Sequence, residues 1–357
     1  EKDMKHENVP QWVEDAIFYQ IFPERFANGD KSNDPNGKVP WNTAPTRENF
    51  FGGDLQGIID HLPYLDNLGI TAIYLNPIFE AKTNHKYDTC NYFSIDPHFG
   101  TKKVFRRLVD QAHKRNIKII LDAVFNHCGE SFWAFKDVKN KGASSEYSDW
   151  FCINHFPIET DSLNYQTAGC TWYLPKLNVE NLEVREHLLE VATYWIKEFH
   201  IDGWRLDIPW KVPYDFWVTF RDRIKTINPN AYIVGEIWRD STPWLKGDTC
   251  DGVMNYSLRN FIMDYCLYED MDAEDFDYEV TKLRKSQKGL APFQLNLLGS
   301  HDTPRFITLC EKDIEKAAIA WTFIFTYIGS PMIYYVDKIG LEGHNDPDTR
   351  KTMVWDK

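Results

Sequence analysis

Four apolar segments that each end in polar residues constrain the fold of this chain more than any other feature of its sequence. In residues 201–207 the apolar run stops at Arg205 and Asp207, and strand alternation places these two side chains on the same side. Taken alone, such a pair is more often a plain salt bridge than a functional site. Three further segments have the same form, which makes chance a poor explanation, and they are residues 119–127, 232–238 and 295–302.

Strand-like and helix-like patterns alternate along the chain with no linker between them. Parallel strands joined by helices imply a right-handed wound sheet or barrel. The patterns predict helices over 55–68, 102–115, 182–199, 214–227 and 313–328, with further helices within 257–287. They predict eight strands, over 16–22, 70–75, 117–124, 201–207, 232–238, 253–255, 295–302 and 331–335. The sequence therefore predicts an α/β fold, a (β/α)8 TIM barrel.

Residues 128–177 interrupt this alternation with a stretch that has no steady period. The stretch is too long for an ordinary loop, so we predict a small inserted subdomain after the third strand. The barrel itself then comprises residues 1–127 and 178–357. No helical pattern follows the eighth predicted strand, so the last helix of a closed barrel is expected to be missing.

The composition excludes several classes of partner. A formal net charge of −13 argues against nucleic acid or an anionic membrane surface, because neither would attract an acidic protein. The seven cysteines are odd in number and lack CxxC spacing, which disfavours a zinc site or a disulfide framework. No apolar run approaches membrane-spanning length and no signal peptide opens the sequence, so we expect a cytoplasmic protein.

Three acidic residues, Asp207, Glu236 and Asp302, lie at the ends of the fourth, fifth and seventh predicted strands. A closed barrel points all three into one mouth, where like charges push pKa values apart, so one acid can stay protonated while another is ionised beside Arg205. That division of labour cleaves glycosides, and a separation of roughly 5 to 5.5 Å between the two carboxyl groups would give retention. His127 and His301 could donate hydrogen bonds to sugar hydroxyls, although a lone histidine at a strand end is more often structural.

A loop after the first predicted strand crowds hard oxygen ligands among glycines and prolines. Such spacing is typical of a Ca²⁺ site, but it is also what ordinary turns are made of. The candidate ligands are Asn28, Asp30, Asn33, Asp34, Gly52 and Asp54.

From about residue 12 to residue 356, the chain resembles the α-amylase family of glycoside hydrolases. It is most similar to the branch of neopullulanase, cyclomaltodextrinase and maltogenic amylase. The segments that carry this resemblance are 122–127, 203–207, 235–238 and 300–303, together with 174–178, which resembles the branch's own signature.

The resemblance implies a role for each candidate residue. Asp207 would be the nucleophile, Glu236 the general acid/base and Asp302 the stabiliser of the transition state. The 28–54 cluster resembles the family's calcium site, so Ca²⁺ is the implied cofactor. The residues that would hold the sugar at the cleavage point are Tyr87, His127, Arg205 and His301, and those that would shape neighbouring subsites are Trp238, Asp346 and Arg350.

The implied function is that of a retaining, endo-acting hydrolase of α-1,4-glucosidic bonds, with an α-glucan oligosaccharide as its partner. Its substrates would be maltooligosaccharides, cyclodextrins or starch-like glucans. Two alternatives stay open. One is a transglycosylase or isomerase that uses the same site. The other is a non-catalytic sugar-binding relative, although such relatives typically lose one or more of the carboxylates that this chain keeps.

The chain also departs from the family pattern. Val336 and Lys338 stand where a glycine and an acid are usual, and residues 208–211 differ from the usual polar ones, which leaves the leaving-group preference open. The branch's N-terminal domain, through which relatives dimerise, its final barrel helix and its C-terminal β-domain have no counterpart here. We therefore expect an excised catalytic core of marginal stability, with an uncovered apolar flank beside the first and eighth strands.

Overall fold

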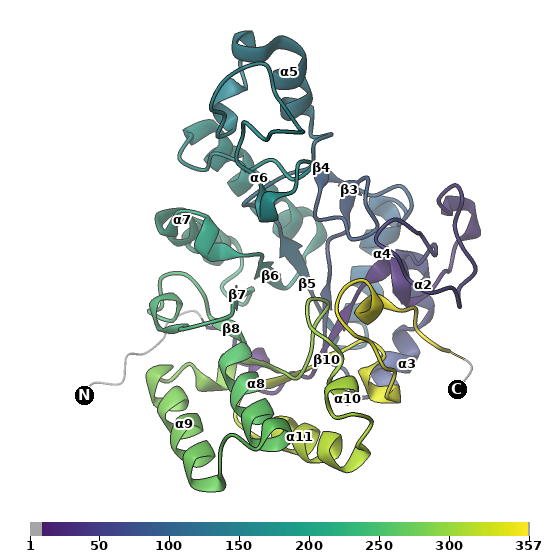
Figure 1. Ribbon diagram of the computed structural model, residues 1–357, viewed down its shortest axis with the longest axis vertical. Helices are drawn as coiled ribbons and strands as arrows, with labels where there is room; N and C mark the ends of the chain where they lie inside the picture. The colour runs from purple at the N-terminus through teal and green to yellow at the C-terminus, as the bar shows by residue number, and fades with distance from the viewer. Residues whose placement is uncertain (1–8, 356–357) are drawn as a thin grey trace.

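Eight parallel strands form a closed barrel in the computed structural model, which describes residues 9–355 (Figure 1). Each strand pairs with the barrel strand that follows it in the chain, and the last pairs with the first. This confirms the predicted barrel. The strands are β1 (Phe18–Ile21), β2 (Ala72–Leu75), β5 (Lys118–Ala123), β6 (Gly203–Leu206), β7 (Tyr232–Ile237), β8 (Gly252–Asn255), β9 (Leu295–Leu297) and β10 (Ser330–Tyr334).

The pairing register decides which side chains become neighbours at the carboxyl ends of the strands. Asp122 of β5 pairs with Arg205 of β6, and Arg205 pairs in turn with Val234 of β7. Glu236 lies two residues further along β7, on the same side as Val234 because alternate side chains share a face. Acidic and basic groups from three adjacent strands therefore converge at one end of the barrel.

Helices cover the outside of the barrel (Figure 1). The observed bounds of α6 and α7 match the predicted helices. Asn181 caps α6, and the buried apolar stripe of this helix faces the strands. The predicted helix 55–68 is instead two helices that meet at His61, because Pro63 in the first turn of the second has no N–H with which to continue the first. The helices around the barrel are α1 (Pro23–Phe26), α2 (Leu55–Asp60), α3 (Leu62–Asn67), α4 (Lys102–His113), α6 (Leu182–Phe199), α7 (Tyr214–Ile227), α8 (Tyr256–Met263), α9 (Ala273–Ser286), α10 (Phe306–Leu309) and α11 (Ile314–Thr326).

Between β5 and α6 the chain leaves the barrel and forms α5 (Trp133–Lys141) and three 3-10 helices, η3 (Gly142–Ser144), η4 (Ser148–Trp150) and η5 (Ala168–Cys170). Figure 1 shows α5 at one end of the long axis, with α9 and α11 at the other. Below α5 in that view lies a hairpin that the sequence did not predict, formed by β3 (Phe79–Ala81) and β4 (Thr89–Ile95). Its pairing shifts register twice, and burial along β4 does not alternate, so the pattern that signals a strand is missing.

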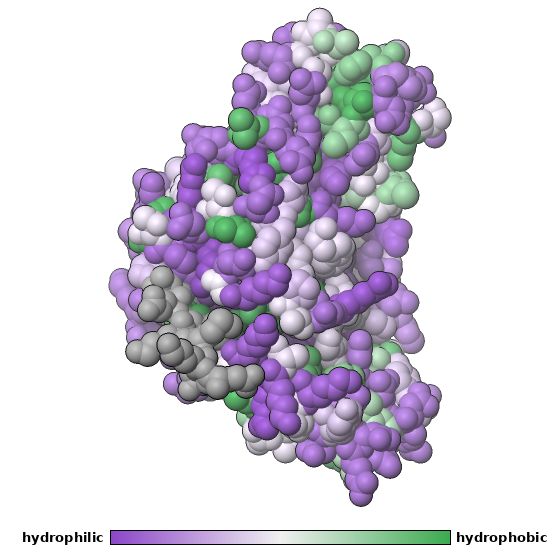
Figure 2. Space-filling view, turned by 90° about the vertical axis from the view of Figure 1, so that its left-hand side faces the viewer, coloured by the Kyte–Doolittle hydropathy of each residue, from purple (hydrophilic) through white to green (hydrophobic). Residues whose placement is uncertain are grey.

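After β10 the described residues form two 3-10 helices, η10 (Asp337–Ile339) and η11 (Asp348–Arg350). Trp355 then packs on α1 and the neighbouring turn: its indole donates to the Phe26 carbonyl at 2.8 Å and stacks on His61 at 3.7 Å. In the described part of the chain, no helix is both long and apolar enough to cross a membrane. Figure 2 shows a face on which hydrophilic side chains predominate, with hydrophobic ones gathered towards its upper end.

We expect the cap of α6 to contribute measurably to stability. The Asn181 side chain accepts hydrogen bonds from the N–H groups of Glu183 and Val184, at 2.8 and 3.2 Å. Replacing Asn181 by Ala leaves these donors without a protein partner and should lower the free energy of unfolding by about 1 kcal/mol. Urea unfolding of Asn181→Ala measures the loss. Asn181→Asp keeps a capping oxygen and is the control, so equal losses in both variants would contradict the capping role.

Candidate active site

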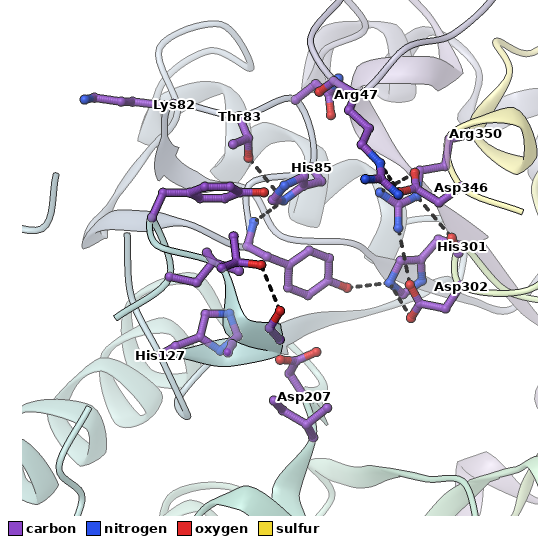
Figure 3. Close-up of a pocket in the computed structure, with 18 of the residues that line it drawn as sticks. Arg47, Lys82, Thr83, His85, His127, Asp207, His301, Asp302, Asp346 and Arg350 are labelled. Atoms are coloured by element: carbon purple, nitrogen blue, oxygen red, sulfur yellow. Dashed lines mark hydrogen bonds and ion pairs between the residues drawn. The ribbon is translucent and has the colours of Figure 1, made fainter. Parts of the chain in front are cut away.

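The three predicted catalytic carboxylates line one cleft at the carboxyl ends of the barrel strands, with a volume of about 900 Å³. Asp207 follows β6, Glu236 lies near the end of β7, and Asp302 lies in the turn after β9. Figure 3 shows Asp207 at the bottom of this cleft and Asp302 on one wall. The structure thus brings together the three acids that the sequence placed on separate strands.

Arg205 lies beneath these acids, completely buried, and contacts three carboxyl groups at once. Its Nη1 donates to both oxygens of Asp122, at 2.9 and 3.1 Å, and to Asp207 Oδ1 at 2.8 Å. Its Nη2 lies 2.9 Å from Glu236 Oε2, as an ion pair without hydrogen-bond alignment. The single guanidinium therefore sets the relative positions of the nucleophile and acid/base candidates.

The two oxygens of Glu236 have different surroundings. Oε2 accepts the backbone N–H of Ile208 at 2.8 Å and faces the Arg205 cation. Among residues 9–355, only the Trp238 indole N–H donates to Oε1, at 2.7 Å. A proton on Oε2 would sit against a cation and a second donor, so a protonated Glu236 carries its proton on Oε1.

Burial controls the titration of these acids. It raises the pKa of Glu236 above its ordinary value, with Arg205 opposing the shift and Asp302 adding to it. It raises the pKa of Asp207 as well, again against Arg205. One buried cation faces three buried carboxylates, and this imbalance favours a proton held within the cluster. Glu236 is the better holder of that proton, because Asp122 and Asp207 both accept aligned hydrogen bonds from Arg205.

Asp302 is held from outside the cluster. Arg350 Nη2 lies 3.3 Å from Asp302 Oδ1, while its Nη1 lies 3.0 Å from Asp346 Oδ1. His301 Nε2 lies 3.1 Å from Asp302 Oδ2. Figure 3 shows these side chains gathered on one wall of the cleft. The sequence predicted all four of these residues, and the structure places them in contact.

The histidines that line the cleft are neutral near pH 7. Burial lowers the pKa of His127 to about 4 and that of His85 to about 3, and it holds the pKa of His301 well below its ordinary value. Gln20 Nε2 donates to His301 Nδ1 at 2.8 Å, so the ring proton lies on Nε2, 2.7 Å from the Tyr87 hydroxyl. The His301 Nε2–H therefore faces the Tyr87 hydroxyl, whereas the neutral rings of His85 and His127 each keep one N–H donor for a ligand hydroxyl group.

Two polar residues of this site were not assigned roles from the sequence. Asp122 accepts the hydroxyl groups of Tyr74 and Tyr87, at 2.7 and 2.9 Å, in addition to Arg205. His85 accepts the backbone N–H of Tyr87 at 3.1 Å and lines the cleft. The sequence places Asp122 as an acid within an apolar strand segment, which could have pointed to it. No local pattern distinguishes His85 from other loop residues.

The remaining predicted residues fall into three positions. Tyr87, His127, Asp346 and Arg350 line the cleft, and Arg205 lies under it. Trp238 lies behind Glu236, with its ring stacked on Tyr256 at 3.7 Å. No other predicted substrate-binding residue lies outside the cleft in the described chain.

The two departures after the last strand do not face the cleft. Val336 is buried at a φ of +75°, a conformation that favours the glycine it replaces. The Lys338 ammonium group donates to the Tyr19 hydroxyl at 2.6 Å, and its burial lowers its pKa to about 8. Neither residue lines the described cleft, so neither contacts a substrate bound there directly.

The predicted metal ligands lie together between β1 and α2. Asp54 is saturated by protein donors, since it accepts the N–H groups of Gly29, Asp30 and Gly57 and the Asn33 amide, at 2.6 to 3.1 Å. The described residues contain no group of three or more His, Cys, Asp and Glu side chains arranged for a metal. However, Asn28 Oδ1 and Asn33 Oδ1 are buried without a hydrogen-bond partner. Two orphaned amide oxygens among carboxylates fit a hard cation such as Ca²⁺.

Comparisons with known proteins agree with this geometry. Residues 20–357 match the sequence model described as "Alpha amylase, catalytic domain". A cyclomaltodextrinase from Geobacillus thermopakistaniensis is 52% identical over 351 residues, which cover 98% of this chain and 60% of that protein. An intracellular maltogenic amylase from Bacillus subtilis is 48% identical, with 98% and 59% covered. The chain thus spans about 60% of the length of these curated relatives.

Comparison with solved structures also finds a relative with a very similar fold. The ligand-free cyclic α-maltosyl-(1→6)-maltose hydrolase from Arthrobacter globiformis superposes with a TM-score of 0.96 at 48% identity, covering 98% of this chain and 80% of that one. The family resemblance predicted from the sequence motifs is confirmed.

Proposed function

The chain belongs to the α-amylase family of glycoside hydrolases, and from that premise we propose that it is a retaining hydrolase of α-1,4-glucosidic bonds in maltooligosaccharides and cyclic maltooligosaccharides. The observation that carries the proposal is the shared contact of Arg205 with Asp207 and Glu236, at 2.8 and 2.9 Å. It supports an ionised nucleophile beside a protonated acid, which is the pairing that glycoside cleavage requires. The names of the relatives support the choice of substrates.

In the first step, Asp207 attacks the anomeric carbon while the bond to the leaving oxygen breaks. Arg205 occupies Asp207 Oδ1, and Oδ2 accepts no hydrogen bond within the described residues, so Oδ2 is the attacking atom. Glu236 gives the proton on its Oε1 to the leaving oxygen. In the second step, Glu236 takes a proton from water, which attacks the anomeric carbon and releases Asp207. Two inversions at one carbon give net retention.

The other polar groups bind and orient the sugar. We assign Asp302, held by Arg350 and His301, to the hydroxyl groups of the sugar at the cleavage point, where its hydrogen bonds would strengthen in the transition state. The neutral ring of His127 supplies a donor without competing for the catalytic proton, while His301 positions Tyr87 and Asp302. We infer a cytoplasmic location from the name of the intracellular relative.

We also propose that the 28–54 cluster binds Ca²⁺, with Asn28, Asp30, Asn33, Asp34 and Gly52 as the residues that would hold it and Asp54 holding the backbone of Gly29 and Asp30 and the Asn33 amide in place. The unpartnered oxygens of Asn28 and Asn33 support this assignment. The metal would neutralise carboxylates in the loop between β1 and α2 and tie that loop to the N-terminus of α2, which Asp54 caps.

Substitution of the three acids tests the assigned roles. Asp207→Asn, Glu236→Gln and Asp302→Asn should each lower turnover by at least roughly 10²- to 10⁴-fold without unfolding the chain. Glu236→Gln should still react with a substrate whose aryl leaving group needs no proton, and azide should then release the glycosyl-enzyme. Asp207→Asn should not form that intermediate. Asp302→Asn should be slow both on the oligosaccharide and on the substrate with the aryl leaving group.

NMR of the first product decides the stereochemistry that these roles require. The newly formed reducing sugar should be the α-anomer before mutarotation. A β-anomer from the parent enzyme would exclude Asp207 as a nucleophile.

The pH dependence of turnover should report on carboxyl groups. Glu236 must be protonated, and its pKa lies above the ordinary value, so kcat should fall as the pH rises through that pKa. The Trp238 N–H stabilises the ionised form of Glu236, so Trp238→Phe should raise this pKa and move the alkaline limb up by about one pH unit. Tyr256→Phe is the control, because it keeps the stacking partner of Trp238 and removes only a hydroxyl that contacts Ser300. An alkaline limb unchanged in Trp238→Phe would contradict the proton's place on Oε1.

Removal of the metal should lower thermal stability. A ligand that binds only the native state at 100 times its Kd stabilises it by about 2.7 kcal/mol, so excess EGTA should lower the Tm on the order of 5 °C. Added Ca²⁺ should restore the Tm in the parent but not in a double Asn28→Ala, Asn33→Ala variant. An unchanged Tm, with no metal found by elemental analysis, would refute the calcium site.

A further inference from the structure

The loop between β3 and β4, residues 82–88, forms part of the wall of the catalytic cleft and carries Tyr87 into it. The Tyr87 hydroxyl donates to Asp122 Oδ2 at 2.9 Å and lies 2.7 Å from His301 Nε2. Its ring stacks on that of His301, with the ring centroids 5.6 Å apart. Contacts with other strands therefore fix the hydroxyl end of Tyr87, whereas the position of its backbone depends on the loop.

Lys86, next to Tyr87 in the chain, does not line the cleft but is buried, with 1% of its side chain exposed. Its ammonium group lies 2.8 Å from Asp96 Oδ2 and donates to the Ala81 carbonyl at 3.2 Å. Two aromatic rings also face this nitrogen, at 5.6 and 5.3 Å, those of Phe50 and Phe99. Breaking a buried ion pair leaves the other charge uncompensated, so the Lys86 side chain is firmly anchored.

The backbone of Lys86 adopts a left-handed conformation, with a φ of +64°. This conformation is unfavourable for any residue with a Cβ atom, and it persists only where surrounding contacts fix it. The anchored ammonium group supplies such a contact. Because the backbone angles of residue 86 set the direction in which the chain enters Tyr87, a return of residue 86 to a negative φ would redirect the Tyr87 side chain.

We propose that the buried Lys86–Asp96 ion pair is a positioning element, which holds residue 86 in its left-handed conformation and thereby aims Tyr87 at the sugar in the cleft. Lys86 acts through Tyr87 and not on the substrate. Asp96 is a firm partner, because it also accepts the backbone N–H groups of Ala81 and His98, each at 3.0 Å. The proposal rests on the proposed function, since Tyr87 faces a sugar only if the cleft binds one.

A double-mutant cycle in kcat/KM for maltotriose tests whether Lys86 acts through Tyr87. Lys86→Met removes the charge at a similar length and should lower kcat/KM about tenfold, as for one lost ring contact. In a Tyr87→Ala background, the same substitution should lower kcat/KM by less than about twofold, because the side chain to be positioned is gone. Asp96→Asn breaks the pair from its other side and should show the same dependence on Tyr87. Equal losses in both backgrounds overturn the proposal.

Lys86→Gly separates the backbone conformation from the charge. Glycine adopts a positive φ without strain, so this variant should lose less than about threefold in kcat/KM, although it also leaves Asp96 without its cation. A loss as large as that of Lys86→Met would overturn the role assigned to the conformation of residue 86.

The matched control is Lys225→Met on α7. Lys225 is also buried, with its ammonium group 2.8 Å from Asp251 Oδ2, and it does not line the cleft. This variant should keep the kcat/KM of the parent even where its Tm falls. A loss of kcat/KM equal to that of Lys86→Met would show that breaking any buried lysine pair has this effect, and would overturn the proposal.

A crystal structure of Lys86→Met decides the question without an activity measurement. We expect a negative φ at residue 86 and no hydrogen bond between the Tyr87 hydroxyl and Asp122. Retention of both the positive φ and this hydrogen bond overturns the proposal while leaving the proposed function intact. Failure of the parent to cleave maltotriose overturns the proposed function instead, and the crystal structure then decides whether Lys86 positions Tyr87.

Discussion

The buried guanidinium of Arg205 is the interaction on which the rest of the site depends. It contacts Asp122, Asp207 and Glu236 within 3.1 Å, and each of these acids comes from a different segment of the barrel mouth. Removing a cation from such a cluster would leave buried carboxylates without a counter-charge, which is strongly destabilising. Because the register of β5, β6 and β7 places these groups side by side, the barrel fixes their geometry before any substrate binds.

The charge imbalance around Arg205 divides the chemical roles of the acids. The three hydrogen bonds that Arg205 donates to these acids go to Asp122 and Asp207, and the remaining contact with Glu236 is an ion pair only. Glu236 makes the weakest contact with the cation and therefore keeps the proton. The proton lies on Oε1, the oxygen that accepts the Trp238 N–H. One positive charge thus favours an ionised nucleophile and a protonated acid at the same pH.

Backbone strain supports this arrangement. Ile208 has a φ of +35° and a ψ of +53°, although a β-branched residue strongly disfavours the left-handed region. This conformation lets its N–H donate to Glu236 Oε2 and starts the turn of η6 (Pro209–Lys211), which contains Trp210. Strain of this kind persists where the surrounding structure fixes it, and here it holds the Ile208 N–H against the acid catalyst.

The sequence alone determined the barrel, its eight strands and the acids at the strand ends, because strand alternation and helical periodicity are local patterns. It also placed the bounds of α6 and α7, which depend on neighbouring residues only. It could not determine the β3–β4 hairpin, whose irregular pairing carries no period, or the part played by His85, which depends on contacts across a loop. The tertiary structure alone decided that Asp122 shares Arg205 with Asp207 and Glu236, and that Lys86 pairs with Asp96. These groups meet only when the closed sheet and its loops bring distant segments together, and a local pattern carries no information about which side chains then touch.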